Sequence, residues 1–284
     1  MERRSVCIYY TGCKYTMKDI ELSQRMRAVA DMVRPGSRVC DIGCDHAFVS
    51  IYLVANGIAD RVIASDVRTG PCAIARDNIS RWKLSDKIDL RLGDGLSTVK
   101  PGEADAIVIA GMGGILITDI LEAGNTVVEK ARQLVLQPQS ELEHVRRYIY
   151  DNGWTISEEN MLVDAGKYYV VINVDLGRHK AKSEAVSAAK TSSDIADKEN
   201  NNKGRWAEAE KNCNNPDMQE IYFKYGRYLL ECHSPVLREY LEKQKRTVEA
   251  LVSGLEKTET DNAVKRCQEL RHELDCIDMA LKCI

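Results

Sequence analysis

Val39-Cys40-Asp41-Ile42-Gly43-Cys44-Asp45-His46-Ala47 joins the end of an apolar, β-branched run to the start of a helical pattern. A strand that ends in Asp-x-Gly and turns into a helix presents backbone N–H groups and a carboxylate at the carboxyl edge of a parallel sheet, where open α/β folds bind nucleotides. We therefore predict a ligand site whose candidate contacts are Asp41, Gly43, Cys44, Asp45 and His46. A simple tight turn is the alternative, because Asp45 and Ala47 take the places of two glycines of a G-x-G-x-x-G loop.

Short β-branched runs alternate with longer helical stretches around this turn. Strands separated by helices indicate βαβ crossovers, so the expected fold class is α/β with a mostly parallel, doubly wound sheet. The expected strands are Arg38–Asp41, Val62–Ser65, Ile88–Leu92, Ala106–Ala110, Gln133–Gln137 and Tyr168–Asp175. The expected helices are Glu21–Val33, Ala47–Asn56, Pro71–Trp82, Gly114–Glu122 and Glu141–Asn152.

Acidic residues also follow the second and third expected strands. Asp66 ends Ala64-Ser65-Asp66, where a carboxylate can accept hydrogen bonds from both ribose hydroxyls of an adenosine ligand. Asp94, followed by Gly95, stands where an adenine amino group is commonly held. Acidic positions at the ends of three successive strands are hard to explain as solvated surface, so we predict that they share one site.

The fourth expected strand ends in Gly111-Met112-Gly113-Gly114 and opens a helix. Three glycines within four residues allow positive φ angles and a close approach of backbone to a flat ligand. A purely structural loop is the alternative reading of this motif.

These motifs resemble the bacterial tRNA (adenine-22-N1)-methyltransferase family. The resemblance runs from about Leu22 to Gly177 and includes further motifs: Leu22-Ser23-Gln24-Arg25-Met26, Gly70-Pro71, Arg91-Leu92-Gly93-Asp94-Gly95-Leu96 and Leu136-Gln137-Pro138-Gln139. It implies a Rossmann-like class I methyltransferase domain, S-adenosylmethionine as cofactor, tRNA as partner and N1 of an adenine as the methylated atom. It also implies that Arg25 joins the cofactor contacts and that Gly111, Met112, Gly113 and Gly114 position the target base.

The resemblance has departures that touch the expected site. Cys44 stands where the family usually has Ser, Phe48 where it has Tyr, Ser50 where Pro is common, and Cys72 where an aromatic residue is common. Phe48 removes a hydroxyl near the implied methyl-donor site. No general base is implied, because neutral adenine carries a lone pair and no proton on N1; positioning and exclusion of water should supply most of the catalysis. The adenine must be unpaired or flipped before reaction.

The C-terminal part of the chain has a different pattern. Residues 178–216 are rich in Ala, Ser, Lys, Asp, Glu and Asn, which is typical of a linker that cannot bury a core. Residues 217–284 are expected to form an antiparallel helical hairpin of coiled-coil type. Its apolar positions step by three and four residues: Leu237, Leu241, Gln244, Val248, Leu251 and Leu255, then Cys267, Leu270, Leu274, Ile277 and Leu281, with a break around Lys257–Asn262.

The N-terminal boundary is set by Met17, which directly precedes the first helical pattern. Residues 1–16 show neither a period nor a targeting signal, so we interpret them as a non-native or disordered extension. Residues 17–177 are then the S-adenosylmethionine-binding domain. The basic residues Lys243, Lys245 and Arg246 on the hairpin are candidate contacts to the RNA backbone.

Composition sets the remaining expectations. The ten cysteines are scattered without a C-x-x-C pair or a histidine at metal-ligand spacing, so we expect no metal and no disulfide framework. The chain lacks an apolar run of membrane-spanning length, and we expect a cytoplasmic monomer. The net charge of −3 does not decide the partner.

Two other functions share parts of this pattern. A nicotinamide-dependent oxidoreductase would share the fold and Asp66 but requires G-x-G-x-x-G, which the first turn lacks. A non-catalytic RNA-binding protein with a degenerate methyltransferase fold stays the open alternative.

Overall fold

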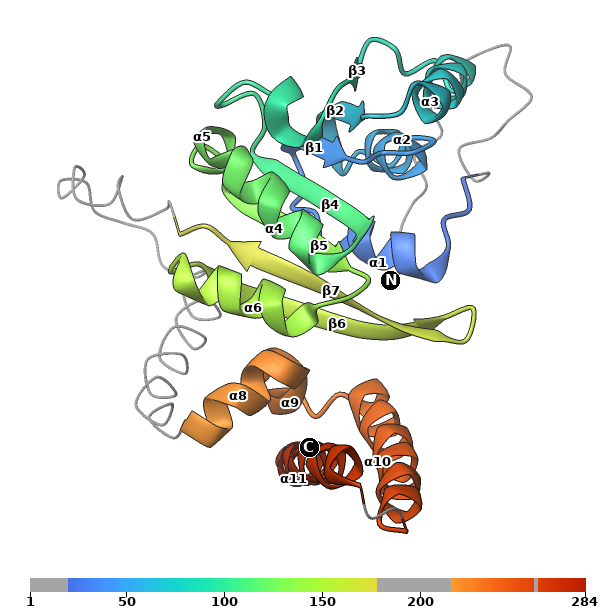
Figure 1. Cartoon of the computed structure of the whole chain (residues 1–284). Coiled ribbons are helices and arrows are strands. Elements are labelled where there is room, and N and C mark those ends of the chain that lie inside the picture. The colour runs from blue at the N-terminus through green and yellow to red at the C-terminus, as the bar shows by residue number, and fades with distance from the viewer. Residues whose placement is uncertain (1–19, 178–215, 258–259) are drawn as a thin grey trace, which may run out of the picture.

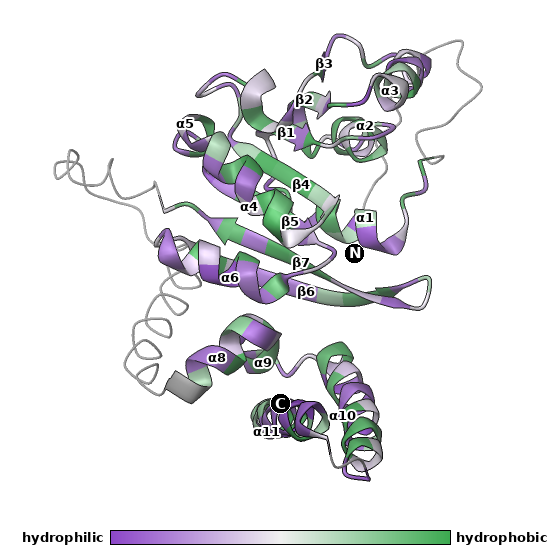
Figure 2. Ribbon diagram, viewed as in Figure 1, coloured by the Kyte–Doolittle hydropathy of each residue, from purple (hydrophilic) through white to green (hydrophobic). Residues whose placement is uncertain are grey.

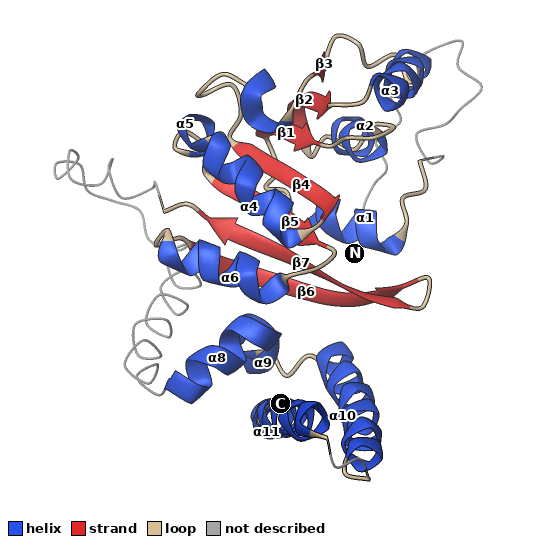
Figure 3. Cartoon of the chain, viewed as in Figure 1, coloured by secondary structure: helices blue, strands red, loops and turns tan. Residues whose placement is uncertain are grey.

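The computed structural model describes residues 20–177, 216–257 and 260–284. The expectations for residues 1–16, and for all of the 178–216 segment except its last residue, lie outside these residues. Within the described part, one sheet holds the strands and ten α-helices surround or extend it (Figures 1 and 3).

The sheet has seven strands in the order β3-β2-β1-β4-β5-β7-β6. Strands β1 to β5 pair in parallel, whereas β7 is antiparallel to β5 and β6 is antiparallel to β7. The α/β class and the mostly parallel sheet are thus confirmed. The strands are β1 (Ser37–Ile42), β2 (Ala59–Asp66), β3 (Ile88–Leu92), β4 (Ala106–Met112), β5 (Gln133–Pro138), β6 (Thr155–Asp164) and β7 (Lys167–Asp175).

Strand β6 was not among the expected strands, and it is the main error in the strand prediction. Its sequence puts the charged Glu159 at an inward position, so an apolar alternation does not stand out. The other six expected strands are present, each with the same core residues and ends that differ by at most three residues.

Helices cover both faces of the sheet. The bounds are α1 (Gln24–Asp31), α2 (Phe48–Ala55), α3 (Thr69–Arg81), η1 (Gly95–Thr98, a 3₁₀ turn), α4 (Gly114–Ala123), α5 (Asn125–Val128) and α6 (Leu142–Asp151). Helices α1 to α3 bury one face of the parallel strands, and α4 to α6 bury the other. Figure 2 shows β4 as a largely hydrophobic ribbon, as expected for a strand covered on both sides.

The C-terminal helices lie beyond the β6 edge in Figure 1. They are α8 (Pro216–Tyr225), α9 (Arg227–Glu231), α10 (Pro235–Leu255) and α11 (Asp261–Cys283). The expected hairpin corresponds to α10 and α11, which pack on each other; α8 and α9 are additional helices that the apolar period did not indicate. Gly226, with a φ of 88°, separates α8 from α9.

The hairpin seam departs from the expected heptad at one position. Leu251 was placed in the seam but is 50% exposed, whereas Val252 is buried. The buried residues of α10 are Leu237, Leu241, Val248 and Val252, so the spacing keeps the expected positions up to Val248 and the next step is four residues instead of three.

A buried ion pair joins the sheet to these helices. Arg146 of α6 donates from Nε to Oε1 of Glu159 on β6 at 2.8 Å, and the two side chains are only 3% and 0% exposed. Nη1 of Arg146 also donates to the backbone carbonyls of Phe223 and Lys224, near the end of α8. The C-terminal helices therefore share one hydrophobic cluster with the sheet and are fastened to it by polar contacts as well.

Candidate functional site

The β1–α2 turn folds tightly against the end of β2. The N–H groups of Gly43 and Cys44 both donate to the carbonyl of Ser65, at 2.8 and 3.0 Å. Gly43 has a φ of 71°, and Asp45 and Ala47 also have positive φ angles. A non-glycine residue in this region is uncommon and costs conformational energy, so the turn carries local strain of the kind found at ligand sites.

Asp41 lies under this turn and is buried. Oδ2 accepts a hydrogen bond from the hydroxyl of Ser50 at 2.6 Å. Burial raises the pKa of Asp41 to about 6, against the opposing effect of the Ser50 hydrogen bond; the nearby charge of Asp66 adds to the rise. Ser50 is a departure from the family pattern that supplies this hydrogen bond, which the usual Pro cannot donate.

Asp66 is 3% exposed at the end of β2. Its Oδ2 accepts from the N–H of Asp45 at 3.1 Å, and its Oδ1 accepts from the N–H of Arg68 at 2.9 Å. The Arg68 guanidinium, 64% exposed, also contacts Oδ1 and Asp45. Each carboxylate oxygen keeps a second lone pair, so Asp66 can accept ribose hydroxyls when the exposed Arg68 side chain moves aside.

Asp94 and Gly95 stand at the start of η1, next to the end of β2. The N–H of Gly93 donates to the carbonyl of Asp66 at 3.0 Å, which brings the β3 loop against the β2 loop. The Asp94 side chain is exposed. Gly95 has a φ of 49° and packs on Ile120. Asp41, Asp66 and Asp94 therefore lie at the same edge of the sheet.

The glycine loop, Gly111 to Gly114, begins within the last residues of β4 and has two different parts. Gly111 has a φ of 80° and faces the side chains of Arg25 and Gln139. Gly114 opens α4, and a Cβ there would press on the backbone carbonyls of Ser140 and Glu141, at 2.7 and 2.8 Å. Gly114 is therefore needed because a Cβ does not fit there, whereas Gly111 is needed because of its positive φ.

Met112 connects the glycine loop to the β1–α2 turn. A Cβ added to Gly43 would overlap the Met112 methyl group, so the two loops are in direct contact. The N–H of Gln139 donates to the carbonyl of Met112 at 2.8 Å, which holds the backbone of the loop against the end of β5.

Arg25 lies on the glycine-loop side of the site. Its Nη1 donates to Oε1 of Gln137 at 2.7 Å, its N–H donates to Asp164 at 3.1 Å, and its guanidinium stacks over Tyr169 with 5.1 Å to the ring centroid. These contacts place Arg25 beside Gly111 and the end of β5. The structure thus brings Arg25 to the region of the expected base cradle.

His46 and Phe48 form the outer part of the β1–α2 turn. The carbonyl of His46 accepts a hydrogen bond from the side-chain amide of Asn78 at 3.0 Å. The rings of His46 and Phe48 meet edge to face, with 6.1 Å between their centroids. Phe48 is 47% exposed, so its ring lies on the surface where the family usually places a phenol. Cys44 is buried in the same turn, and burial raises the pKa of its thiol.

Several neighbours of the site were missed in the sequence. Arg68 and Gln137 contact predicted site residues, and exposed apolar side chains extend from the loops at the same edge: Val67, Leu92, Ile115 and Leu116. The signal was available for Ile115 and Leu116, which directly follow the glycine loop on the first turn of α4. Contiguous exposed apolar residues at a ligand edge are typical of a recognition surface.

The arrangement fits a nucleoside-containing cofactor such as S-adenosylmethionine. A positive-φ glycine permits close approach at the turn, the buried Asp66 supplies a charged acceptor, and the exposed Asp94 adds a second. A cavity of about 770 Å³ lies elsewhere, around Arg38, Arg61 and Ile88 at the amino ends of β1 to β3. Ligands of open α/β sheets bind at the opposite, carboxyl edge, so this cavity is separate from the site.

No helix among the described residues is long and apolar enough to cross a membrane.

The chain is similar to known methyltransferases. Residues 22–172 match the family described as "Methyltransferase domain". The tRNA (adenine(22)-N(1))-methyltransferase of Bacillus subtilis is 38% identical over 171 residues, which cover 60% of this chain and 72% of that protein.

Solved structures extend the likeness over the C-terminal helices. The crystal structure of the B. subtilis m1A22 tRNA methyltransferase superposes with a TM-score of 0.72 at 27% identity, covering 93% of this chain and all of that one. A putative tRNA (m1A22) methyltransferase of Streptococcus pneumoniae, solved in complex with S-adenosyl-L-methionine, gives a TM-score of 0.69 at 27% identity over 92% of this chain.

Proposed function

Because the chain belongs to the tRNA (adenine(22)-N(1))-methyltransferase family, we propose that it transfers the methyl group of S-adenosylmethionine to N1 of adenine 22 in tRNA. One observation carries the proposal furthest: Met112 of the glycine loop rests on Gly43 of the β1–α2 turn. An adenine held at the glycine loop would then face a methyl donor held at the turn. When bound, the cofactor supplies an electrophilic methyl group on a sulfonium.

The acidic residues at the carboxyl edge of the sheet are proposed to hold the cofactor. Asp66 would accept the ribose hydroxyls, and Asp94 with Gly95 would hold the adenine end. The backbone of Gly43, Cys44 and the following residues would line the methionine end, with Asp41 buried beneath it. These roles rest on placement at the edge of the sheet and on donor chemistry.

The glycine loop is proposed to position the target base, with Arg25, expected from the resemblance to contact the cofactor, beside it. Gly111 lets the backbone approach the flat ring, and the Arg25 guanidinium lies beside Gly111 while its Nη1 donates to Gln137 of β5. N1 attacks with its own in-plane lone pair, so no side chain has to remove a proton. The protein must instead align N1 with the methyl group and keep water out, and alignment of reactants alone is worth about 7–11 kcal/mol in favourable cases.

The target adenine must leave its stack to reach this site. Exposed Ile115 and Leu116 on the first turn of α4 offer apolar contact to the displaced base or its neighbour. Basic residues of α10 would add phosphate contacts that orient the tRNA. We propose that the protein acts as a monomer in the cytoplasm.

The decisive experiment is methylation of two tRNA transcripts that differ only at position 22, one with adenine and one with guanine. Methyl transfer to the first transcript, none to the second, and a reverse-transcription stop at position 22 are expected. Tight tRNA binding with no methyl transfer would favour the non-catalytic RNA-binding function and overturn the proposal.

A further inference from the structure

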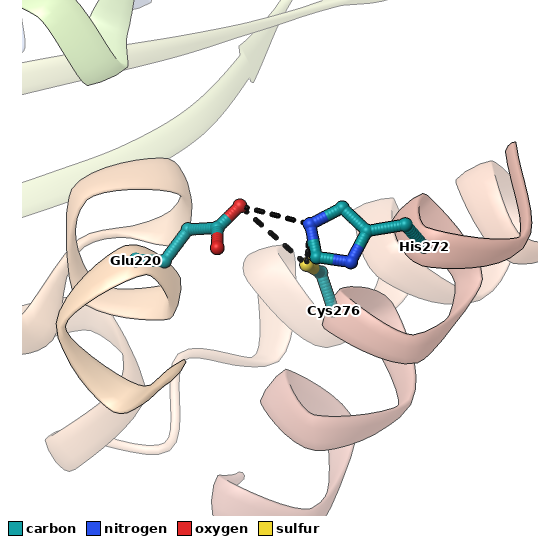
Figure 4. A group of neighbouring side chains, drawn as sticks. All are labelled: Glu220, His272 and Cys276. Carbon is teal, nitrogen blue, oxygen red and sulfur yellow. Dashed lines mark hydrogen bonds and ion pairs between the residues drawn. The ribbon is translucent and has the colours of Figure 1, made fainter. Parts of the chain in front are cut away.

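Three side chains with metal-binding atoms meet between α8 and α11, away from the methyltransferase site. Glu220 belongs to α8, and His272 and Cys276 lie one turn apart on α11 (Figure 4). Glu220 Oε1 lies 3.2 Å from His272 Nε2 and 4.0 Å from Cys276 Sγ, and Sγ lies 3.9 Å from Nε2. All three side chains point toward one another.

These separations are close to those of a tetrahedral zinc site. Zinc binds oxygen and nitrogen at about 2.0–2.2 Å and thiolate sulfur at about 2.3 Å, so tetrahedral angles put neighbouring donors about 3.3–3.6 Å apart. The observed triangle differs from this by about half an ångström or less. Small side-chain rotations would complete the geometry without moving either helix.

The donor set selects the class of metal. One imidazole, one thiol and one carboxylate suit Zn²⁺, whereas Mg²⁺ and Ca²⁺ prefer oxygen donors alone. Histidine and cysteine four residues apart on a helix share one face, which is how helices often present two metal ligands. The pair was missed in the sequence because its spacing acquires meaning only within α11, and Glu220 lies 52 residues away from His272.

Lys224 presently supplies the positive charge at this cluster. Its Nζ lies 2.6 Å from Glu220 Oε1 and 3.3 Å from Cys276 Sγ. A cation is therefore already favoured here, and an incoming metal must displace the ammonium group. The Lys224 side chain is 24% exposed and lines a cavity of about 370 Å³, which gives it room to withdraw.

The same cavity is an acidic entrance to the cluster. Glu143, Glu269 and Glu273 line it together with His272 and Lys224. Glu143 pairs with Arg147 and Glu269 pairs with Arg266, while among the described residues no ion pair is formed by Glu273. The Glu273 carboxylate therefore keeps its negative charge at the mouth, where it attracts cations.

We propose that Glu220, His272 and Cys276 form a zinc-binding site with water as the fourth ligand, and that Lys224 competes with the metal for it. On binding, the Cys276 thiol releases its proton to solvent and the thiolate bonds to zinc, with no change in oxidation state. The site would tie α8 to α11. Since Arg146 holds the end of α8 to the sheet, zinc would stiffen the attachment of the whole helical region.

The test uses the full chain without an affinity tag, reduced and stripped of metal with a chelator. Titration with Co²⁺ alone should give a thiolate-to-cobalt charge-transfer band that saturates at one equivalent and disappears on adding Zn²⁺. Zinc should also raise the melting temperature by several degrees, because it binds the folded state. Absence of the saturable band in the wild-type protein would overturn the proposal.

Substitutions separate a metal site from a plain hydrogen-bonded cluster. Cys276→Ser should abolish the charge-transfer band, and His272→Ala should weaken zinc binding by more than about 10-fold, since even outer partners of metal ligands are worth about 10–100-fold. His272 is mostly exposed, so its removal leaves the fold intact. Cys232→Ser, at an exposed cysteine on another turn, is the matched control and should behave as wild type.

Lys224→Met gives the clearest test, because a metal site and a plain hydrogen-bonded cluster predict different changes in zinc affinity. It removes the competing ammonium and should tighten zinc binding, whereas a cluster whose only cation is Lys224 would lose stability and gain no metal affinity. Unchanged or weaker zinc binding by Lys224→Met, or a charge-transfer band that persists in Cys276→Ser, would contradict the site.

Discussion

The methyl group of Met112 occupies the space that a Cβ on Gly43 would fill, so the loop after β4 and the turn after β1 are one contact surface. The proposed base cradle and the proposed cofactor turn therefore touch through the flexible end of the Met112 side chain. A substitution at Gly43 or at Met112 should therefore change the effect on stability of a substitution at the other residue.

Gly43→Ala should lower the free energy of unfolding by about 1–2 kcal/mol because of the positive φ, and by a smaller amount because the flexible end of Met112 must turn away. In the Met112→Ala background only the backbone cost should remain. Gly57→Ala is the matched control, because Gly57 also has a positive φ, of 67°, but open space around its missing Cβ. Urea denaturation of wild type, the two single variants, the double variant and the Gly57→Ala control measures the coupling, and a larger cost of Gly43→Ala in the Met112→Ala background than in wild type would contradict the contact.

Asp66→Ala should weaken S-adenosylmethionine binding by about 2 kcal/mol, because the ribose hydroxyls lose a charged acceptor. Asp60→Ala, at an exposed position near the amino end of the same strand, is the control and should bind normally. Isothermal titration measures both. Unchanged affinity of Asp66→Ala would remove Asp66 from the site.

Asp41 should make stability depend on pH. Its pKa is raised to about 6 in the folded protein, from an ordinary value of 3.8, so the folded state binds the proton more tightly than the unfolded state. This contribution is fully present below about pH 4 and is lost as the pH rises through 6. The shift corresponds to a cost of about 3 kcal/mol at neutral pH.

Asp41→Asn should therefore be more stable than wild type at pH 7.5, with a difference that shrinks toward pH 4.5. Chemical denaturation at the two values measures it. A pH-independent difference would mean that Asp41 keeps an ordinary pKa.

Arg146→Ala should cost about 3–5 kcal/mol of stability, because it leaves Glu159 buried and without its partner. Replacing both residues by apolar ones, as in Arg146→Met with Glu159→Leu, should recover much of the loss. Thermal denaturation of the single and double variants measures their stabilities. If Arg146→Ala destabilises the protein only by loss of packing, the double variant should be no more stable than the single variant.

Among the basic residues of α10, Arg246 and Lys245 should behave differently. Arg246 is exposed, with its guanidinium bonded only to the carbonyl of Glu242 among the described residues, whereas Lys245 pairs with Asp278 of α11 at 2.6 Å. Arg246→Ala should reduce the slope of log affinity for tRNA against log salt by about 0.7–0.9. Lys245→Ala should leave the slope unchanged and lower the melting temperature, and the reverse pattern would reassign the two residues.

The sequence predicted the parallel strands and the loops at their carboxyl ends well, because fully buried strands are marked by β-branched runs and the loops by glycines and acids. Strand β6 was not predicted because the charged Glu159 stands at an inward position. Its burial is explained only by the ion pair with Arg146, which lies on another element. Leu251 was misplaced because a step of three fits the heptad as well as a step of four until the partner helix is known.

The same limit applies to the site. Asp41, Asp66 and Asp94 could be read from their positions after strands, whereas the contact of Met112 with Gly43 and the bond of Arg25 to Gln137 are tertiary relationships without a local signal. Local motifs therefore located the edge of the sheet at which the site lies. The contacts among the site residues depend on tertiary packing, which the local motifs do not indicate.

The carbonyls that complete the hydrogen bonding of Arg146 belong to Phe223 and Lys224, far later in the chain than the last strand of the sheet. A ribosome that has released all seven strands has thus delivered the guanidinium and Glu159 but not the acceptors that finish the cluster. During translation the nascent sheet must wait for α8 before the buried Arg146 guanidinium gains these two acceptors. Pausing within the intervening segment would prolong the period in which β6 is exposed to proteases and chaperones.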